Sequence, residues 1–391
     1  MYVYLDHAAT TPMRPEVREA MAPYFDERFG NPSSMHRWGR QARNALEQAR
    51  ERVAGALGAA RRDVVFTGGG TEADNIAVLG RWRSSCAAAP GSRGAAVVCT
   101  AVEHKAVGAA AQSAADEGAQ LIILGVDEYG RVDPSAVEEA LRERPCVVSV
   151  IWANNEVGTI QPVAEIAALC RAAGVAFHSD AVQAFGKLRV RVDEAGCDMV
   201  SISAHKVGGP KGIGALCIRE STHVLPLVHG GGQERELRPG TENVAAAVGF
   251  ATAAELAVAE REEEAARLAA LRDLLEAGLR AAAPDLIVNG PPDGRLPNIL
   301  NVTLPDTDQE GLLIGLDLEG VAASGASACA SGTVKPSHVL AAMGALRPGA
   351  ASVRLSLGRT STAAEIDTAI AAFGRVVDQL RTPASYPASS V

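Results

Sequence analysis

The sequence lacks the cysteine patterns of a metal-binding or disulfide-stabilised protein. Its seven cysteines form no C-x-x-C pair, and none lies in a cysteine–histidine cluster with zinc-binding spacing. We therefore predict no metal site. Cys99, Cys146 and Cys217 lie in apolar runs, where a cysteine is most simply a buried free thiol. This pattern fits a reducing compartment, and we expect a cytoplasmic protein.

Long apolar runs and an excess of positive charge are also missing. No stretch approaches the roughly 18 uninterrupted apolar residues of a membrane helix, and the first residues lack the basic and apolar regions of a secretory signal. The formal net charge of -9 argues against a broad nucleic-acid-binding surface, because phosphate neutralisation needs clustered lysines and arginines. We expect neither a membrane span nor a direct nucleic-acid partner.

The composition, 47% hydrophobic and 21% charged, is that of a globular protein, and 391 residues allow two domains. Between about residues 60 and 220, short β-branched runs alternate with helical patterns. Seven runs are predicted to be strands: 63–67, 95–100, 120–126, 146–152, 175–180, 198–205 and 214–219. Apolar strands separated by helices indicate an α/β fold with a mainly parallel sheet that is covered on both faces.

The pattern changes near residue 243. Residues 243–283 are rich in Ala, Leu, Glu and Arg, and are predicted to form one long helix or two consecutive helices. We expect the Ala-rich part, up to residue 259, to be amphipathic. The last third of the chain mixes strands with helices, as a smaller α+β domain would. We therefore predict a large domain, a small domain built from two segments, and a flexible tail: 13–257, 1–12 with 258–383, and 384–391.

Polar residues follow the carboxyl ends of the predicted strands, where open parallel sheets bind ligands. The run GGGTEADN follows strand 63–67, and its free N–H groups and the Thr71 hydroxyl would suit a phosphate. It has neither the G-K-[ST] of a Walker A loop nor the G-x-G-x-x-G spacing of a dinucleotide fingerprint. Taken alone, this run is more simply a tight turn that needs glycine.

Asp180 ends one predicted strand, and Lys206 comes directly after a later one. An acidic residue and a lysine in these places are the pair that pyridoxal 5'-phosphate (PLP) chemistry needs. The lysine amine forms a Schiff base with the cofactor, and the carboxylate keeps the pyridine nitrogen protonated so that the ring withdraws electrons. Either residue alone would most simply be a solvated surface charge. The position of Lys206, between an apolar strand and the run VGGPKGIGA, argues against that interpretation.

The sequence resembles the cysteine desulfurases, the NifS/IscS-like group of class V enzymes in the PLP-dependent aminotransferase superfamily. The resemblance covers nearly the whole chain through motifs in the same order: YLDHAATTP, FGNPSSMH, FTGGGTEADN, VEHKAV, NNEVGTIQP, HSDAVQ, SAHKVGGPKGIGAL, HGGGQERELRPGTEN, PNILNV, ASACASGTVKPSHVL and SVRLSLGR. It implies the PLP fold type I, like that of aspartate aminotransferase. It also implies that the protein converts L-cysteine to L-alanine and passes the sulfur on.

The resemblance assigns the cofactor-binding residues. Lys206 would carry PLP, Asp180 would contact the pyridine nitrogen, and His104 would stack on the ring and assist proton transfer. Gln183 would face the phenolic oxygen of the cofactor. The remaining cofactor contacts would come from Gly70, Thr71, Asn155, Ser203, His205 and Thr241.

Two further implications concern the substrate and the partner subunit. Asn155 and Arg354 match residues near the substrate carboxylate, which a guanidinium can hold through two parallel hydrogen bonds. Thr241 matches a threonine that reaches the phosphate in the other subunit. The resemblance therefore implies a homodimer with shared sites.

The resemblance places the catalytic nucleophile at Cys329, in the small-residue run SGASACASGTVKP. Such a run has little to bury and is expected to be a mobile surface loop. A loop suits the reaction, because the thiolate must attack the substrate sulfur inside the site and then carry the persulfide to an acceptor protein. Ala326 and Pro239 depart from the commoner residues of the family, beside the functional positions.

The sequence leaves other functions open. A selenocysteine lyase or another class V PLP enzyme would share the cofactor residues, although transamination needs no thiol. The intact set of Lys206, Asp180 and His104 opposes a non-catalytic sulfur-relay or scaffold protein, and the missing glycine fingerprint opposes a dehydrogenase. The sequence also leaves open the acceptor, which could serve iron–sulfur cluster assembly, tRNA thiolation, DNA sulfur modification or cofactor biosynthesis.

Overall fold

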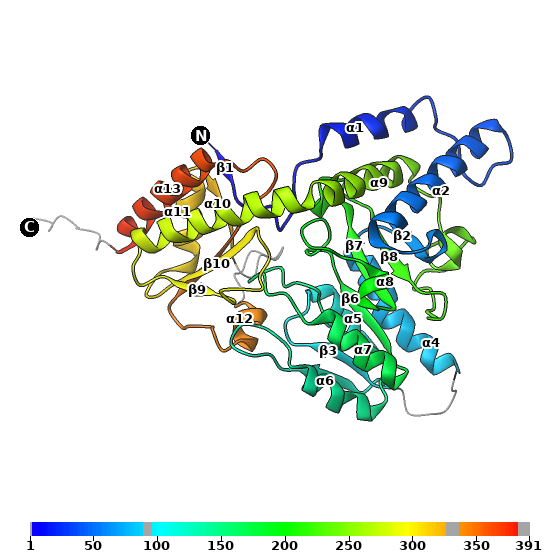
Figure 1. Ribbon diagram of the computed structural model, residues 1–391, viewed down its shortest axis with the longest axis horizontal. Coiled ribbons are helices and arrows are strands. Elements are labelled where there is room, and N and C mark those ends of the chain that lie inside the picture. Colours follow the sequence, from blue (N-terminus) through cyan, green and yellow to red (C-terminus); the bar gives the residue numbers. More distant parts are fainter. Residues whose placement is uncertain (1, 89–94, 326–335, 382–391) are drawn as a thin grey trace, which may run out of the picture.

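The computed structural model describes residues 2–88, 95–325 and 336–381. A larger and a smaller layered unit lie side by side, and two helices placed end to end run across both of them (Figure 1). These are α9 (Val244–Ala259) and α10 (Arg261–Ala282). The sequence predicted one long helix or two consecutive helices in this part of the chain, and the structure has two.

The larger unit is built on a sheet of seven strands. Their order across the sheet is β2 (Val64–Thr67), β8 (Gly214–Ile218), β7 (Met199–Ser203), β6 (Ala176–Asp180), β5 (Val147–Ser149), β3 (Val97–Thr100) and β4 (Leu121–Leu124). Strand β8 is antiparallel to both of its neighbours, and the other neighbouring pairs are parallel. The predicted α/β fold with a mainly parallel sheet is confirmed.

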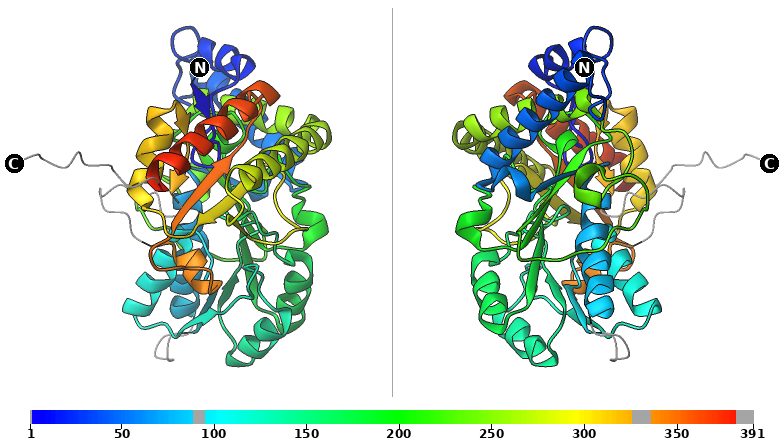
Figure 2. Two further views of the ribbon diagram at one scale, coloured as in Figure 1. Left: turned by 90° about the vertical axis from the view of Figure 1, so that its left-hand side faces the viewer. Right: turned by 90° about the vertical axis from the view of Figure 1, so that its right-hand side faces the viewer.

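Helices cover both faces of this sheet, as the two side views show (Figure 2). On one face, Val64 and Phe66 of β2 belong to a core that includes residues of α9. On the other face, Val65 of the same strand belongs to a core with residues of α5 (Lys105–Asp116). This alternation arises because successive side chains of a strand point to opposite faces.

The remaining helices of the larger unit are short, apart from one. They are α1 (Pro15–Met21), α2 (Arg37–Leu57), α3 (Gly70–Asn75), α4 (Arg81–Ala88), α6 (Pro134–Ala140), α7 (Val163–Ala173) and α8 (Val192–Ala195). Helix α6 begins as its sequence predicts, because the Asp133 side chain accepts a hydrogen bond from the Ser135 N–H at 2.9 Å. The expected amphipathic character of α9 is wrong: residues 244–251 are all buried, since α1, α2 and α9 pack together.

The smaller unit contains an antiparallel four-stranded sheet and its own hydrophobic core. The strands are, in order, β12 (Ser324–Gly325), β13 (Ala351–Ser356), β10 (Ile299–Leu304) and β9 (Ile287–Asn289). Helices α10, α11 (Gln309–Leu318) and α13 (Ala363–Arg381) contribute to this core, and α12 (His338–Ala342) lies beside the larger unit. The exact domain boundaries stay a prediction.

The N-terminal residues join the smaller unit. Strand β1 (Val3–Tyr4) pairs in parallel with β11 (Val321–Ala322), and the residues after β1 continue past Ser356 toward the larger unit. Residues 6–9 are thereby brought to the junction of the two units. No helix among the described residues is long and apolar enough to cross a membrane.

Candidate active site

A cavity of about 330 Å³ lies at the carboxyl ends of the parallel strands, with residues of both units in its wall. It contains most of the predicted site residues, namely Gly70, Thr71, His104, Asn155, Asp180, Gln183, Ser203, His205, Lys206 and Arg354. A larger cavity of about 670 Å³ lies around Arg50 and Glu234, and none of the predicted residues lines it. We therefore locate the site by its side chains and not by its volume.

Lys206 ends a single turn, η5 (Ala204–Lys206), that directly follows β7. Its Nζ donates hydrogen bonds to the carbonyl oxygens of Ala8, at 2.5 Å, and Ala9, at 2.7 Å. Burial, together with the nearby charge of Arg354, lowers the pKa of this amine to about 8. A buried lysine with a lowered pKa is more often neutral at physiological pH, which makes it a better nucleophile.

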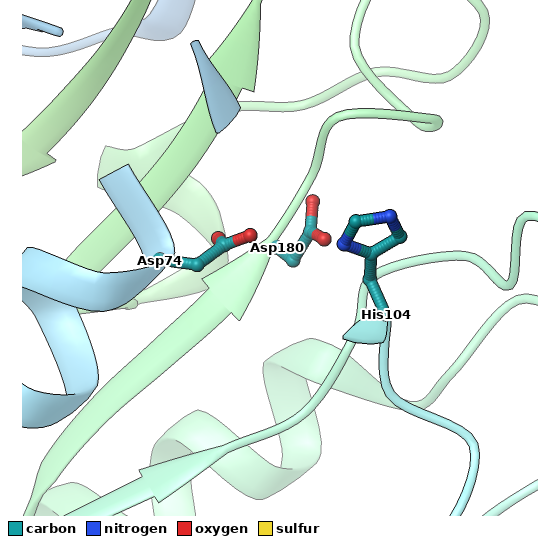
Figure 3. Close-up of side chains that lie close together, drawn as sticks. All are labelled: Asp74, His104 and Asp180. Carbon is teal, nitrogen blue, oxygen red and sulfur yellow. The ribbon is translucent and has the colours of Figure 1, made fainter. Parts of the chain in front are cut away.

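Asp180 lies between His104 and Asp74 (Figure 3). The three side chains each offer an oxygen or nitrogen atom, and these atoms lie within 4.8 Å of one another. Asp180 ends β6, is 4% exposed, and accepts a hydrogen bond from the Val182 N–H at 2.9 Å. Burial raises its pKa, and the nearby His104 and Lys206 oppose that shift.

His104 caps the N-terminus of α5. Its Nδ1 accepts a hydrogen bond from the Ala106 N–H at 3.2 Å, so the proton of a neutral ring sits on Nε2. Burial lowers the pKa of this imidazole. The cap fixes the ring over one wall of the cavity, where it lies next to Asp180 (Figure 3).

Several polar groups at this cavity have free hydrogen-bonding capacity. Among the described residues, the buried Oγ of Ser203 and Oε1 of Gln183 have no hydrogen-bond partner. Helix α3 begins at Gly70, where a Cβ atom would lie 2.7 Å from Cγ2 of Val182, so this close approach requires glycine. The first N–H groups of a helix lack partners within it. Donors of this kind, beside the Thr71 hydroxyl, could hold a phosphate.

His205 lies next to these groups. Its Nδ1 is 3.1 Å from Oγ1 of Thr10, and burial lowers its pKa to about 4. The ring is therefore neutral at physiological pH and offers one N–H donor. Together, the lysine, the buried carboxylate, the histidine beside it and the free donors fit PLP, because each part of that cofactor would have a matching group.

Arg354, on β13, brings a cation from the smaller unit into the cavity. Its Nη2 donates to Oδ1 of Asp6 at 2.7 Å, and its Nη1 donates to the carbonyl oxygen of Asn155 at 3.1 Å. Its Nε is buried and has no partner among the described residues. Asn155 and Arg354 are therefore in contact in this cavity, and the contact is made by the backbone carbonyl group of Asn155 and not by its side chain.

Among the described residues, one predicted site residue does not line this cavity. Thr241 is exposed and lines a separate cavity of about 260 Å³, next to Arg238. The role predicted for Thr241 is a contact with the phosphate of another subunit. The position of Thr241 within its own chain does not test that role, which stays a prediction. Cys329 and Ala326 lie outside the described residues.

The sequence did not single out four residues in the cavity wall: the buried Asp74 and Glu156, and the more exposed Lys105 and His338. Glu156 accepts a hydrogen bond from the Ser337 hydroxyl at 2.5 Å, and His338 Nε2 is 2.9 Å from the Glu103 carbonyl oxygen. Acidic residues that directly follow strands or glycine-rich turns are the signal that could have identified Asp74 and Glu156. His338 carries no such signal.

The fold and this site define a class. A parallel sheet with a lysine and a buried aspartate at the carboxyl ends of neighbouring strands is the arrangement of class V aminotransferases. The pattern of the aminotransferase class-V family matches residues 3–368.

Within that family the relatives are more specific. The chain is 46% identical to an IscS-like cysteine desulfurase of Mycobacterium tuberculosis, over 97% of this chain and 98% of that protein. A solved NifS-like protein superposes with a TM-score of 0.89, at 35% identity, over 97% of this chain and 100% of that one. The protein SspA, solved in complex with cysteine, superposes with a TM-score of 0.79, at 33% identity, over 91% and 98%. The chain belongs to the cysteine desulfurase family.

Proposed function

We propose that the protein is a PLP-dependent cysteine desulfurase, which converts L-cysteine to L-alanine and holds the sulfur as a persulfide on Cys329. The observation that carries this proposal is the convergence of Lys206, Asp180, His104 and Arg354 on one cavity. Full-length likeness to cysteine desulfurases supports the same reaction, as does the likeness to SspA, which was solved with cysteine.

The cavity residues have separate tasks. When bound, PLP withdraws electrons from the Cα atom of the substrate. Lys206 would hold the cofactor covalently and would move a proton at the Cα atom of the substrate, for which its lowered pKa suits it. Asp180 keeps the pyridine nitrogen protonated, and His104 supports the ring. Gly70, Thr71, Ser203 and His205 hold the phosphate, and Gln183 meets the phenolic oxygen.

The cysteine substrate is oriented by its carboxylate. The guanidinium of Arg354 lies in the cavity wall and contacts Asn155, which also lines the cavity. A charged pair of hydrogen bonds of this kind fixes the carboxylate geometrically. The substrate sulfur is thereby held at a defined distance from the protein wall.

Cys329 is proposed to take the sulfur. The segment that contains it follows Gly325, the last residue of β12, which pairs with β13 beside Arg354. The next described residues include His338, in the cavity wall. The thiolate attacks the substrate sulfur, the S–S bond forms as the Cβ–S bond breaks, and a proton completes the methyl group of alanine. Cysteine and thiol therefore become alanine and persulfide without an external oxidant.

We further propose a cytoplasmic homodimer that passes the persulfide to an acceptor protein, such as a scaffold, a carrier or a thiolation enzyme. Four large apolar side chains between the end of α1 and the first turn of α2 support an interface, because they are at least half exposed: Phe25, Phe29, Met35 and Trp38. Iron–sulfur cluster assembly and tRNA thiolation are the pathways that we propose for the acceptor.

One experiment tests the reaction directly. Purified protein is incubated with L-cysteine and a thiol reductant, and alanine and sulfide are both quantified over time. Equal amounts of the two products, from yellow protein that borohydride bleaches, are expected. L-selenocysteine serves as the comparison substrate. Pyruvate in place of alanine, or a reaction confined to selenocysteine, would reject the proposal.

A further inference from the structure

Asp74 lies on α3, and its carboxyl group points at Asp180 (Figure 3). Its side chain is 1% exposed, and neither of its oxygens has a hydrogen-bond partner among the residues that the structure describes. The Ser201 hydroxyl favours the ionised form of Asp74, but burial and the charge of Asp180 outweigh it. Asp74 is not among the residues that the resemblance assigns, and its burial beside a second carboxylate requires an explanation.

A buried histidine faces Asp74 from a strand of the sheet. Nε2 of His178, on β6, lies 3.7 Å from Oδ1 of Asp74. This ring is fully buried, and its nitrogens lie 2.8 Å from the Ser149 hydroxyl and 2.9 Å from the Ser201 hydroxyl. Burial lowers the pKa of His178 to about 3, so it is neutral at physiological pH. His178 therefore cannot balance a carboxylate at Asp74.

A third buried carboxyl group, Glu103, follows β3 and also lies close to Asp180. It accepts hydrogen bonds from the Thr100 hydroxyl at 2.6 Å and from the Ile151 N–H at 2.8 Å. Burial raises its pKa to about 8 all the same. Three buried carboxyl groups cannot all be ionised at neutral pH, because like charges at this separation repel strongly in a desolvated site.

The surroundings decide which carboxyl group keeps its charge. Asp180 accepts the Val182 N–H and lies near His104 and Lys206, all of which favour its ionised form. Asp74 accepts no backbone N–H of this kind from the described residues, although His104 lies within 4.8 Å of it as well. Burial, followed by the nearby charge of Asp180, raises the pKa of Asp74 well above its usual value. Of the two neighbouring aspartates, Asp180 is therefore the one whose surroundings favour the negative charge.

We propose that Asp74 is a positioning residue that stays protonated behind Asp180, and that its acid proton keeps Asp180 ionised and directed at the pyridine nitrogen of PLP. The proposal rests on the proposed function, since it assumes that Asp180 meets that nitrogen. Asp74 does not touch the substrate in this role. It acts by raising the proportion of Asp180 that is charged when the cofactor is bound.

Two substitutions separate a neutral donor from a negative charge. Asp74→Asn keeps the size and a polar N–H donor, whereas Asp74→Leu keeps the size and removes every donor. Asp74→Asn is expected to bind PLP within about threefold of the wild-type affinity. In Asp74→Leu, the pKa of Asp180 rises, and the affinity for PLP at neutral pH falls by about tenfold for each unit of that rise. The deficit of the leucine variant narrows as the pH increases, because Asp180 then ionises without help.

Infrared spectroscopy of the apoprotein with ¹³C-labelled aspartate tests the protonation state without cofactor or activity. The wild type should show a protonated carboxyl band at neutral pH that Asp74→Asn lacks. Any of three results would overturn the proposal. The band could be absent from the wild type, Asp74→Asn could bind PLP as weakly as Asp74→Leu, or Asp74→Leu could bind PLP as tightly as the wild type. If Asp74→Leu does not fold, the carboxyl band of the wild type and the PLP affinity of Asp74→Asn still test the proposal.

A failure of the proposed function would look different. In that case the wild type would yield no alanine from cysteine, while the infrared band and the affinity series could still be measured. PLP titration of the apoprotein, followed by its visible absorbance across pH, provides this independent measure.

Discussion

Arg354 Nη2 lies 2.7 Å from Oδ1 of Asp6, a contact that joins β13 to the segment after β1. The same guanidinium donates to the Asn155 carbonyl oxygen, so it is held from two sides before any substrate arrives. A side chain fixed in this way loses little conformational entropy when it binds a carboxylate. The N-terminal segment therefore orients Arg354 through Asp6, which has no place in the assigned set of site residues.

Replacing Arg354 by alanine should raise KM for cysteine strongly and leave PLP bound. The loss of a charged, partly buried contact costs about 2–4 kcal/mol, or roughly 30- to 1,000-fold in kcat/KM. Arg354→Lys should recover little, because an ammonium cannot reproduce the planar two-point contact. Steady-state kinetics with PLP absorbance as the control measure this. An unchanged KM would show that another residue holds the carboxylate.

The pH dependence of cofactor capture reports on Lys206. Only the neutral amine attacks an aldehyde, and the pKa of this lysine is lowered from 10.5 to about 8. The rate at which the apoenzyme captures PLP should therefore rise with pH and level off above about pH 8. In Arg354→Ala the midpoint should move to higher pH, because one cause of the lowered pKa is gone. Stopped-flow absorbance follows the rate. A midpoint near 10.5 in the wild type would contradict the expectation.

Lys206→Ala provides the control for that experiment. It should abolish the borohydride-trappable link and all turnover, while the fold is retained in circular dichroism. A variant that still forms the trappable link would place the covalent attachment at another lysine.

The sequence predicted the sheet and much of the cavity because both follow local patterns. Apolar β-branched runs marked the strands, and parallel strands bring their carboxyl ends to one edge, so Asp180 and Lys206 could be expected to meet. The strand predicted for residues 146–152 is longer than the strand in the structure. In the structure β5 ends at Ser149, and the N–H of Ile151 donates to Glu103 instead of to a neighbouring strand.

Residues whose role depends on tertiary contacts were not predictable in the same way. Asp74 and Glu103 look like ordinary helix-terminal or loop acids in the sequence, and only packing reveals that both are buried next to Asp180. The burial of residues 244–251 of α9 on all sides was missed for the same reason. Its alanines predict a helix, but their small size also lets α1 and α2 approach closely, which composition alone does not reveal.

A buried ion pair fixes the segment that leads to Thr241. Glu234, in η6 (Gln233–Glu236), accepts two hydrogen bonds from Arg50 of α2, at 2.6 and 2.7 Å, and one from the Phe66 N–H at 2.7 Å. Glu234→Ala should lower the free energy of unfolding by about 3–5 kcal/mol, because the Arg50 charge is left buried without its partner.

Denaturant unfolding measures that loss against an exposed pair as the control. Glu220 lies 2.8 Å from Arg62, and both side chains are 70% exposed. Glu220→Ala should change the stability by less than about 0.5 kcal/mol. Similar effects of the two substitutions would show that the Arg50–Glu234 pair contributes little.

Thr241 is predicted to act across a twofold interface. Its side chain is exposed and lies outside the cavity of its own chain. Thr241→Val should weaken PLP binding and leave the dimer intact, because it removes one hydroxyl from the phosphate site of the other subunit. Sedimentation and PLP titration measure the two properties separately. A fully active monomer would refute the shared site.

Cys329→Ala tests the central step of the proposed reaction. PLP should still bind and cysteine should still perturb its spectrum, because these steps depend on Lys206, Asp180 and His104. Persulfide formation and nearly all alanine production should be lost, since nothing remains to take the substrate sulfur. Cys86→Ala is the matched control, because Cys86 is a partly exposed thiol on α4, away from the cavity. In the wild type, mass spectrometry after one turnover should find about 32 Da added to the peptide with Cys329. Sulfide release from Cys329→Ala at the wild-type rate would show that the protein is a PLP lyase of another kind.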